Sequence, residues 1–323
     1  MRVLVLHSDI ESFAPPDEQD TLVTAKAVAD ALRQGGDQAW EAAFVPEPSA
    51  MTTVLERAQA DVVFNLVESV HGDGLLSCLA PAVFEKLGVR YTGAGAACIA
   101  ISADKTLTKR VLRAAGLPTA DWAESPGWDG LVSNARYIVK SVTEDASRGL
   151  DDGAVVDGAG VTARAKVSRD RHGGRWFAEA YLEGREFNVA ILEEECRIRI
   201  LPIPEMRFEA WDQVRPRIVG YTAKWDEASD DARNTVRAFG IEDEEPALAR
   251  ALNELARKTW NLLGMRGYAR VDFRIDANGD PMILEVNPNP CLEPQAGFAA
   301  AAVRAGISYP DLVAQIVRTG YRG

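Results

Sequence analysis

The stretch Gly267–Pro290 (GYARVDFRIDANGDPMILEVNPNP) restricts the fold of this chain more than any other part of the sequence. Two runs of alternating apolar residues flank Asn278-Gly279, a dipeptide typical of a two-residue hairpin turn with φ > 0 at both positions. That turn fixes which residues face each other across the hairpin. On one face the expected pairs are all apolar: Val271 with Val286, Phe273 with Leu284, and Ile275 with Met282.

The other face of the hairpin places Arg270 opposite Asn287 and Asp272 opposite Glu285. The Asp272–Glu285 pair falls at a non-hydrogen-bonded position, where Cα atoms approach to about 4.5 Å, so the two like charges destabilise the hairpin. A divalent cation between the carboxylates relieves this repulsion, and Asn287 offers a third hard oxygen. The alternative is a hairpin whose acids point into water, and the pattern favours the metal site.

Length, charge and cysteine usage narrow the classes of function. A chain of 323 residues is long enough for two or three domains. Its net charge of −12 argues against nucleic acid or an anionic membrane as the main partner. We see neither a signal peptide nor an apolar run of membrane-spanning length, which favours the cytoplasm. The cysteines and histidines are scattered without a CxxC pair, which favours free thiols over a zinc site or disulfides: Cys78, Cys98, Cys196 and Cys291; His7, His71 and His172.

The first hundred residues alternate short apolar runs with helical patterns. Strands are expected at Arg2–His7, Ala42–Val45, Asp61–Val67 and Val89–Tyr91, and helices at Thr21–Leu32, Met51–Ala58 and Leu75–Leu87. This order predicts an open α/β sheet with right-handed crossovers. Ligands gather at the carboxyl ends of such strands, which here carry the loops Ser8–Asp20 and Glu68–Gly74.

A separate, sheet-rich lobe is expected from about Pro118 to Leu182. Before it, Asp104 caps a helix over Lys105–Ala115, on which Lys105 and Lys109 read as a solvated face by pattern alone. Within the lobe, the strand Arg136–Ser141 leads into the polar loop Val142–Leu150, which can offer N–H groups to an anion. The segments Val161–Ser168 and Arg175–Tyr181 look like a strand pair.

The remainder of the chain supplies a second sheet around the opening hairpin. We expect strands at Gly184–Leu192 and Arg197–Ile203, a surface loop over Gln213–Asp230, and helices at Ala247–Leu263 and Pro310–Val317. The acidic hairpin, the separated lysines and the anion-friendly loop suggest magnesium nucleotide chemistry. No GxxxxGK[ST] P-loop and no kinase HRD/DFG pair is present, so a nucleotide site must be of another type.

An ordered series of motifs resembles the ATP-grasp superfamily, and most closely its D-alanine–D-alanine ligase branch, over nearly the whole chain. The motifs are Phe64-Asn65-Leu66, GVRYTG (88–93), ADKTLTK (103–109), Gly116-Leu117-Pro118, Val139-Lys140, EAYLEGREF (179–187), YTAKW (221–225), Arg270–Asp272 and Glu285–Pro290. The resemblance implies an α/β (α+β) fold of three parts. These are a Rossmann-like N-terminal domain (1–101), a central small lobe (102–182) and a C-terminal catalytic lobe (183–323), with ATP clamped between antiparallel sheets.

The reaction that the resemblance implies is phosphorylation of a carboxylate by ATP, followed by attack of an amine on the acyl phosphate to give an amide and ADP. Asp272, Glu285 and Asn287 match the ligands of magnesium (manganese being possible), in agreement with the hairpin register. Arg270 matches the arginine that steadies negative charge in the transition state. The remaining matches concern ATP: Lys105 and Lys140 at the phosphates, Glu179, Tyr181 and Leu182 at adenine, Glu186 at ribose, Lys224 at the γ-phosphate, and Ser147 with Gly149 in the covering loop.

The departures from the family pattern fall where the two organic substrates would sit. The branch holds the first substrate's amino group with a glutamate, and SDIESFAPPDEQD leaves Glu11, Glu18 or neither for that role. The covering loop has Ala146 for one family serine, Trp225 stands for a tyrosine, and the serine that would bind the second substrate's carboxylate falls at Ala296. Candidate substrate residues are Glu18, His71, Trp225, Asn289 and Cys291.

Three functions remain open on the sequence. The first is a ligase that joins a small-molecule carboxylate to an amine, an amino-acid pair other than D-Ala with D-Ala. The second is a true D-alanine–D-alanine ligase of cell-wall synthesis. The third belongs to a different class, a module that binds ATP or phosphorylates a carboxylate without ligation. The family habit also suggests a homodimer, although the sequence marks no dimer surface.

Overall fold

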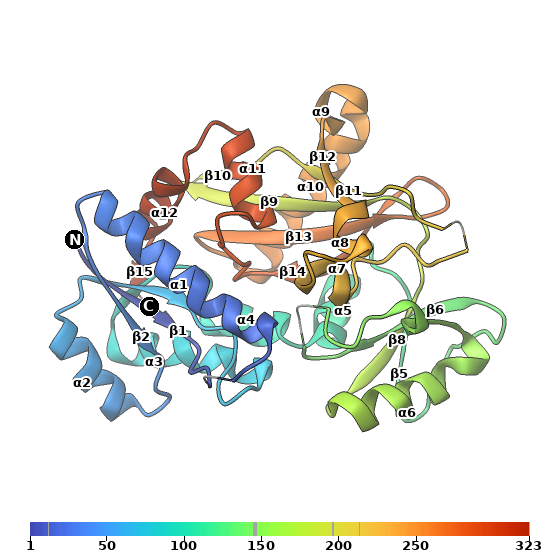
Figure 1. Cartoon of the computed structure of the whole chain (residues 1–323), viewed down its shortest axis with the longest axis horizontal. Helices are drawn as coiled ribbons and strands as arrows, with labels where there is room; N and C mark the ends of the chain where they lie inside the picture. The colour runs from blue at the N-terminus through green and yellow to red at the C-terminus, as the bar shows by residue number, and fades with distance from the viewer. Residues whose placement is uncertain (12, 145–146, 196, 213, 323) are drawn as a thin grey trace.

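Three β-sheets form the framework of the molecule, and Figure 1 shows the first and second at opposite ends, with the third above and between them. The computed structural model describes residues 1–11, 13–144, 147–195, 197–212 and 214–322. Each sheet lies in one part of the sequence, apart from a C-terminal strand that returns to the first sheet. None of the described helices is long and apolar enough to cross a membrane.

The first sheet has the strand order β15-β4-β3-β1-β2, and its strands run parallel except for β15. Its elements are β1 (Arg2–His7), β2 (Gln38–Ala43), β3 (Val62–Leu66), β4 (Arg90–Tyr91) and β15 (Tyr321–Arg322), with α1 (Pro16–Gln34), α2 (Pro48–Ala58), η1 (Gly74–Cys78), α3 (Leu79–Leu87) and α4 (Ala96–Ser102). All five residues of β3 are buried, as expected for a parallel strand covered by helices on both faces. The predicted α/β domain is therefore present.

The start of α1 differs from the prediction. The helix begins at Pro16, so the second half of the expected loop Ser8–Asp20 is helical. Proline fits the first turn of a helix because its missing N–H would be unpaired there, and Asp17 and Glu18 in that turn favour the positive end of the helix dipole.

The second sheet is antiparallel, in the order β5-β8-β6-β7. Its elements are β5 (Trp122–Glu124), β6 (Arg136–Ser141), β7 (Val155–Asp157) and β8 (Trp176–Ala180), with α5 (Lys105–Ala114), η2 (Asp152–Ala154), η3 (Gly158–Gly160) and α6 (Val161–His172). The strand predicted at Val161–Ser168 is wrong, because this segment is α6. Its buried residues Val161, Ala165 and Ser168 recur at helical spacing and pack on the sheet.

The third sheet has the order β12-β11-β9-β13-β14, with β10 paired to β9. Its elements are β9 (Glu186–Glu194), β10 (Arg197–Ile200), β11 (Pro204–Phe208), β12 (Thr235–Phe239), β13 (Tyr268–Ile275) and β14 (Pro281–Asn287), with α7 (Tyr221–Trp225), α8 (Asp230–Asn234), α9 (Ile241–Glu244), α10 (Pro246–Leu263) and α11 (Gly297–Arg304). The predicted surface loop Gln213–Asp230 is only partly right, since it contains α7 and leads into α8. The strands β11 and β12 were not predicted.

One face of the third sheet packs against α10, and the other carries polar side chains. Val189, Val271 and Phe273 lie in a core with α10 residues such as Leu252. Because side chains alternate along a strand, the intervening residues Asn188 and Asp272 point to the opposite face. This opposite face becomes a wall of the candidate site.

The hairpin β13–β14 follows the predicted register at its far end and departs from it near the turn. Arg270 faces Asn287, Val271 faces Val286 and Asp272 faces Glu285, as predicted. Phe273, however, faces Ile283, because Leu284 is an extra residue that forms a bulge between the two registers. The turn itself was mispredicted: only Gly279 has a positive φ (90°), and Asp276 N donates to the Asp280 carbonyl across a three-residue loop.

The end of the chain returns to the first sheet. α12 (Tyr309–Arg318) packs on α1, as Figure 1 shows, and β15 pairs with β4. Leu312, Val313, Ile316 and Val317 are fully buried there in one core with Val28 of α1. The first and last segments of the described chain are thus one structural unit, and the three lobe boundaries stay a prediction.

Candidate active site

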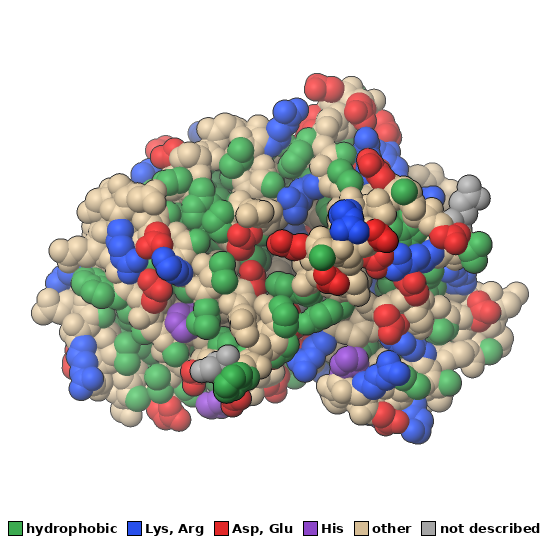
Figure 2. All heavy atoms as spheres, viewed as in Figure 1, with side chains coloured by type: hydrophobic (Ala, Val, Ile, Leu, Met, Phe, Trp, Pro, Cys, Tyr) green, Lys and Arg blue, Asp and Glu red, His purple; other side chains and the backbone are tan. Residues whose placement is uncertain are grey.

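A cavity of about 1030 Å³ opens where the three sheets meet. Figure 2 shows the surface hollowed near the centre of the molecule, with acidic side chains beside the opening. Its walls include Glu68 from the first sheet's loops, Lys140 and Glu179 from the second sheet, and Arg270 and Asp272 from the third. The cavity therefore gathers residues that lie more than two hundred positions apart in the sequence.

The acid pair of the hairpin forms one wall of this cavity. Asp272 is 6% exposed, and Arg270 donates to it through both Nε (2.8 Å) and Nη2 (2.9 Å). Asn188 Nδ2 donates to the same carboxylate at 2.8 Å. Burial raises the pKa of Asp272, and Arg270 opposes that rise. Glu285, on the neighbouring strand, lies 3.2 Å from the Lys105 ammonium.

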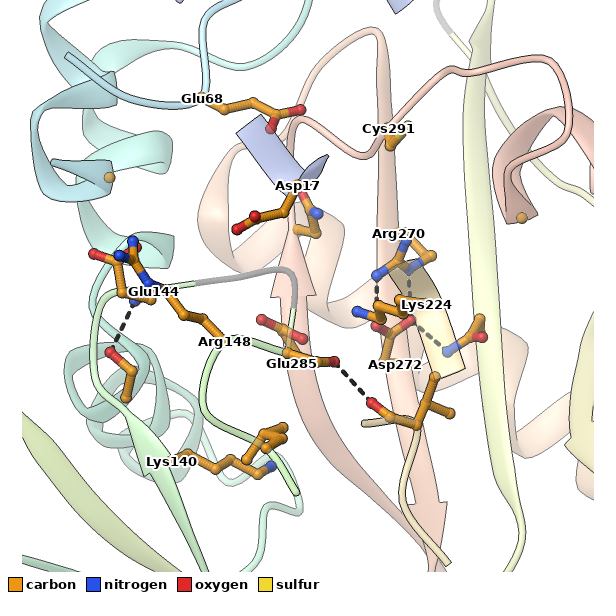
Figure 3. Close-up of a pocket in the computed structure, with 18 of the residues that line it drawn as sticks. Asp17, Glu68, Lys140, Glu144, Arg148, Lys224, Arg270, Asp272, Glu285 and Cys291 are labelled. Carbon is orange, nitrogen blue, oxygen red and sulfur yellow. Dashed lines mark hydrogen bonds and ion pairs between the residues drawn. The ribbon is translucent and has the colours of Figure 1, made fainter. Parts of the chain in front are cut away.

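The donor set of this wall fits a hard divalent cation. Figure 3 shows Asp272 and Glu285 side by side at the cavity. Asn287 lies one pair farther along the same face, and its Oδ1 also accepts from Asn289 N at 2.9 Å. No group of three or more His, Cys, Asp and Glu is arranged for a metal in the described part of the chain. A cation here would thus rely on two carboxylates and an amide, with ligand oxygens completing its shell, as magnesium commonly does.

A buried ion-pair network connects the second sheet to α5. Glu179, 1% exposed, lies 2.5 Å from both the Lys109 and the Lys140 ammonium groups. Lys109, 3% exposed, also donates to Thr119 Oγ1 (2.6 Å) and the Ala120 carbonyl (3.0 Å). Burial alone would raise the pKa of Glu179, but the two lysines outweigh it and hold that pKa below its usual range.

This network corrects one expectation. Lys109 is not part of a solvated helix face, because its ammonium points inward to Glu179 rather than outward from α5. Glu179 lines the cavity and both of its carboxylate oxygens are engaged by lysines, and its match to adenine stays a prediction. Asp104 does cap α5 as predicted, accepting from Leu107 N at 2.9 Å.

Residues matched to the base and ribose lie at one end of the cavity. No hydrogen bond among the described residues uses the Leu182 N–H or the Tyr181 carbonyl. The Leu182 carbonyl accepts from Arg274 Nη1 at 2.8 Å, and Arg274 Nη2 also contacts Glu186 at 2.8 Å. The bulge turns Leu284 into the cavity beside Glu285. This end therefore offers one backbone donor, one backbone acceptor and an apolar side chain.

The loop between β6 and η2 covers the cavity from the second sheet. Ser147 has a positive φ of 62°, and its Oγ donates to the Val219 carbonyl at 2.7 Å. Tyr221 N donates to the Leu150 carbonyl at 3.0 Å, so the loop is held against the start of α7. Lys105 Nζ donates to the Glu144 carbonyl at 3.0 Å. Ala146, like Cys196 elsewhere in the chain, lies outside the described residues.

Lys224 extends from α7 toward the acid pair, as Figure 3 shows. The residue as a whole is exposed, and it lines the cavity. Burial lowers the pKa of Lys224, and the positive charge of Arg270 adds to this shift. No hydrogen bond or ion pair to the Lys224 ammonium occurs within the described residues, and the side chain lines the cavity.

The other end of the cavity contains several predicted substrate residues. Glu18, Trp225, Asn289 and Cys291 line it. Cys291 is a free thiol that donates to Asp20 Oδ2 at 3.0 Å, and burial raises its pKa. The predicted substrate residue His71 does not line the cavity. It is exposed at the tip of a tight turn, because the backbone reverses at His71 and Gly72. Glu11 is also exposed outside the lining.

Sequence reasoning missed several charged residues of this cavity, among them Asp17 and Arg237. Asp17 lines it and accepts from Tyr221 Oη at 2.9 Å, which joins α1 to α7. Its signal was the Pro15-Pro16 pair, which marks the start of a helix. Arg237 lines the cavity from β12, and its signal was the alternating run TVRAF (235–239).

Comparisons with known proteins show what the whole chain is similar to. The model of the family described as D-ala D-ala ligase C-terminus matches residues 134–318. A D-alanine–D-alanine ligase of Acidiphilium cryptum is 31% identical over 98% of this chain and 97% of its own length. An uncharacterized protein, y4sG, of Sinorhizobium fredii is 29% identical over 86% of this chain and 77% of its own. A crystal structure of D-alanine–D-alanine ligase from Bacillus anthracis complexed with ATP has a TM-score of 0.74 at 20% identity, covering 99% of this chain and 97% of that one.

Proposed function

This chain belongs to the D-alanine–D-alanine ligase family of ATP-grasp enzymes, and from that premise we propose that it joins two D-alanine molecules at the expense of ATP. Its predicted ATP-grasp fold and its activity as an ATP-dependent ligase that forms C–N bonds are established by this membership. The proposal that D-alanine is the substrate is supported by relatives that are named D-alanine–D-alanine ligases.

One observation carries the proposal for this site. The acid pair Asp272–Glu285, with Arg270 between it and the substrate end, shares a single cavity with three lysine ammonium groups. Lys105, Lys140 and Lys224 come from three different elements and bring positive charge to one space. Such convergence suits the phosphate chain of a nucleotide, whose negative charge needs several preorganised cations.

In the first step a carboxylate oxygen of the first substrate attacks the γ-phosphorus of ATP. The P–O bond to the β-phosphate breaks, which gives an acyl phosphate and ADP. Lys105 and Lys140 would bind phosphate oxygens, and Lys224 would reach the transferred group. Positioning and fixed positive charge account for most of the catalysis of such a transfer, because the protein itself forms no covalent bond.

Asp272, Glu285 and Asn287 would hold magnesium with the help of phosphate oxygens. When bound, the ion would offset negative charge on those oxygens. Arg270 is held in place by its two bonds to Asp272. Its guanidinium would stabilise the negative charge that develops on the reacting groups.

In the second step the neutral amine of the second substrate attacks the acyl carbon. Phosphate leaves with the electron pair of the broken C–O bond, and the nitrogen loses a proton to form the amide. The cavity walls would exclude water, which otherwise hydrolyses the acyl phosphate. The Ser147 hydroxyl holds the Val142–Leu150 loop to the Val219 carbonyl. This loop would supply N–H groups above the phosphates.

The nucleotide base would lie at the Tyr181–Leu182 end. The unpaired Leu182 N–H and Tyr181 carbonyl match the acceptor and donor on the edge of adenine, and Leu284 offers an apolar surface. Glu186, oriented by Arg274, would accept from a ribose hydroxyl.

A second candidate, another acid–amine pair, is favoured by the substrate end of the cavity. Trp225 and Ala296 bring no hydroxyl group to positions where the family has a tyrosine and a serine, and the turn after Asn287 reads PNPCLEP. A hydroxyl that bonds a substrate contributes strongly to discrimination, so its loss can change which substrate is accepted.

The test is ADP release coupled to mass spectrometry of the product. D-alanine with ATP and magnesium is expected to give the dipeptide, while ADP release only with other pairs from an acid–amine library would favour the second candidate. Glu285→Ala is expected to lose at least roughly a hundredfold in kcat/KM, and the exposed Glu254→Ala on α10 serves as the matched control. ADP formed without any amide would instead favour a carboxylate kinase.

The cytoplasmic location and the homodimer also stay proposals. The cytoplasm supplies the ATP that the reaction consumes. Light scattering after size-exclusion chromatography would test the dimer, and a mass of one chain at micromolar concentration would contradict it.

A further inference from the structure

Arg237 lies on the same sheet face as the acid pair, at the substrate end of the cavity. It sits on β12, where Thr235 and Arg237 both turn toward the cavity. Its Nη1 donates to the Gln295 carbonyl at 3.3 Å, just before α11. The first residue of α11, Gly297, lies beside its Nε.

The guanidinium of Arg237 has little to bind within the protein. Arginine carries five N–H donors, and the bond to Gln295 uses one of them. No ion pair to Arg237 occurs among the described residues, although most other arginines of this cavity have one: Arg270 pairs with Asp272, Arg274 with Glu186, and Arg148 with Glu144. Glu293 is near enough to influence its charge but not to pair with it.

The surroundings of the Arg237 guanidinium favour the binding of an anion. Burial lowers its pKa, and the nearby cation Arg270 adds to this effect. A carboxylate bound between the Arg237 and Arg270 guanidinium groups would offset the effect of Arg270 on the pKa of Arg237. Arginine binds carboxylates through two parallel N–H bonds, which fix orientation as well as charge.

The position of Arg237 separates it from the nucleotide. Along β13, Arg274 bonds the Leu182 segment, Asp272 follows, and Arg270 comes last. The direction from adenine to the reacting groups therefore runs from Arg274 toward Arg270. Arg237 interacts with Arg270 and Gln295, at the Arg270 end of this line.

We propose that Arg237 is a further specificity-determining residue of this ligase, and that its guanidinium binds the carboxylate of the amino acid that supplies the amine. This inference rests on the proposed ligase function and deepens it. It also gives a physical basis for the missing hydroxyl at Ala296, because the charge of Arg237 takes over anion recognition at the same corner of the cavity. The resemblance to the family matched no role to Arg237.

The test compares amines with and without the carboxylate. D-alanine and its amide, D-alaninamide, are supplied as second substrates, together with the L-forms and a panel of other amino acids and their amides. Wild type is expected to prefer the free acids. Arg237→Met should raise KM for the free acids on the order of 10- to 100-fold, the scale of a lost charge-assisted hydrogen bond, with KM for ATP unchanged. Arg237→Lys should recover part of the loss.

Arg233→Met is the matched control, because Arg233 on α8 is exposed, pairs with Asp230 and lies outside the cavity lining. Circular dichroism and the urea midpoint establish that each variant is folded.

The outcomes separate this inference from the function it rests on. If wild type ligates amides as well as acids, the inference is overturned and the ligase function stands. If no pair releases ADP, the ligase function fails, and calorimetry then decides on Arg237. Free amino acids should bind the protein with magnesium and imido-ATP more tightly than their amides do. Equal affinity for acid and amide, or for wild type and Arg237→Met, would overturn the inference.

Discussion

At the scale of single residues, the fold gives two neighbouring lysines of α5 different surroundings, because Glu179 pairs with only one of them. Lys105 and Lys109 are one helical turn apart, and only the fold distinguishes them: Lys105 reaches the cavity, while Lys109 is buried against Glu179. Sequence spacing could not reveal this, because the partner lies seventy residues away on β8. The pairing of Asp272 with Glu285, by contrast, was predictable because a hairpin pairs residues that are close in sequence.

Loss of Lys109 is expected to destabilise the fold. Lys109→Met leaves half of the Glu179 carboxylate unpaired and removes the bond to Thr119, so the free energy of unfolding should fall by about 3 kcal/mol. Urea denaturation with an unchanged m-value measures this. Lys86→Met, an exposed lysine on α3, should change stability by less than about 0.5 kcal/mol. Equal effects of the two substitutions would contradict the buried network.

The same network predicts how stability depends on pH. Because folding lowers the pKa of Glu179, its ionised form stabilises the protein fully above the unfolded pKa of about 4.3. That contribution is lost as pH falls through the lower folded pKa. The difference in unfolding free energy between wild type and Glu179→Gln should therefore shrink between pH 5 and pH 3. A difference that stays constant would show that folding does not lower the pKa of Glu179. The exposed Glu56→Gln should track wild type.

At the scale of elements, local patterns succeeded where one periodicity was clear. β1 and β6 have the predicted bounds, whereas α6 was read as a strand because TARAKV alternates small and charged residues. Tertiary packing of Val161, Ala165 and Ser168 decides for the helix. The bulge at Leu284 escaped notice because an extra residue leaves no mark in the apolar pattern on either side of it.

Gly184 is predicted to be indispensable to the entry into β9. A Cβ atom at this position would lie 1.9 Å from the Ile275 carbonyl oxygen at the end of β13, so the two backbones would have to separate. Gly184→Ala should lower the unfolding free energy by about 3 kcal/mol or more. It should also raise KM for ATP, because Glu186 and Arg274 lie at this crossing.

Gly35→Ala is the control, since its added Cβ meets nothing closer than 3.4 Å. A stable Gly184→Ala protein with an unaltered KM for ATP would contradict the close approach.

At the scale of the whole molecule, contacts between distant segments hold the three sheets around the cavity. Thr119 Oγ1 donates to the Ile283 carbonyl at 2.9 Å, which joins the entry of the second sheet to β14. Tyr221 joins α7 to Asp17 on α1. None of these contacts was predictable, because each links single residues across more than 160 positions without a local pattern.

Removal of α12 and β15 should therefore prevent folding of the first sheet, far from the cut in sequence. Deletion of residues 309–323 takes away Leu312, Val313, Ile316 and Val317, all fully buried. At about 2 kcal/mol for each side chain, the loss is comparable to the whole stability of a typical domain. Near-ultraviolet circular dichroism and urea unfolding measure the result. Arg318→Ala, exposed on the same helix, should behave as wild type, and a cooperative transition of the deleted form would refute the prediction.

The extra residue at Leu284 separates the turn of the β13–β14 hairpin from the acid pair Asp272–Glu285. If evolution removes one residue on the turn side of β14, closing the bulge keeps Glu285 opposite Asp272. The register between Glu285 and Asn287 has no bulge. A single insertion there would turn the Asn287 side chain toward the apolar core. The tip of this hairpin can therefore drift in length among descendants of the chain, while its acidic end cannot.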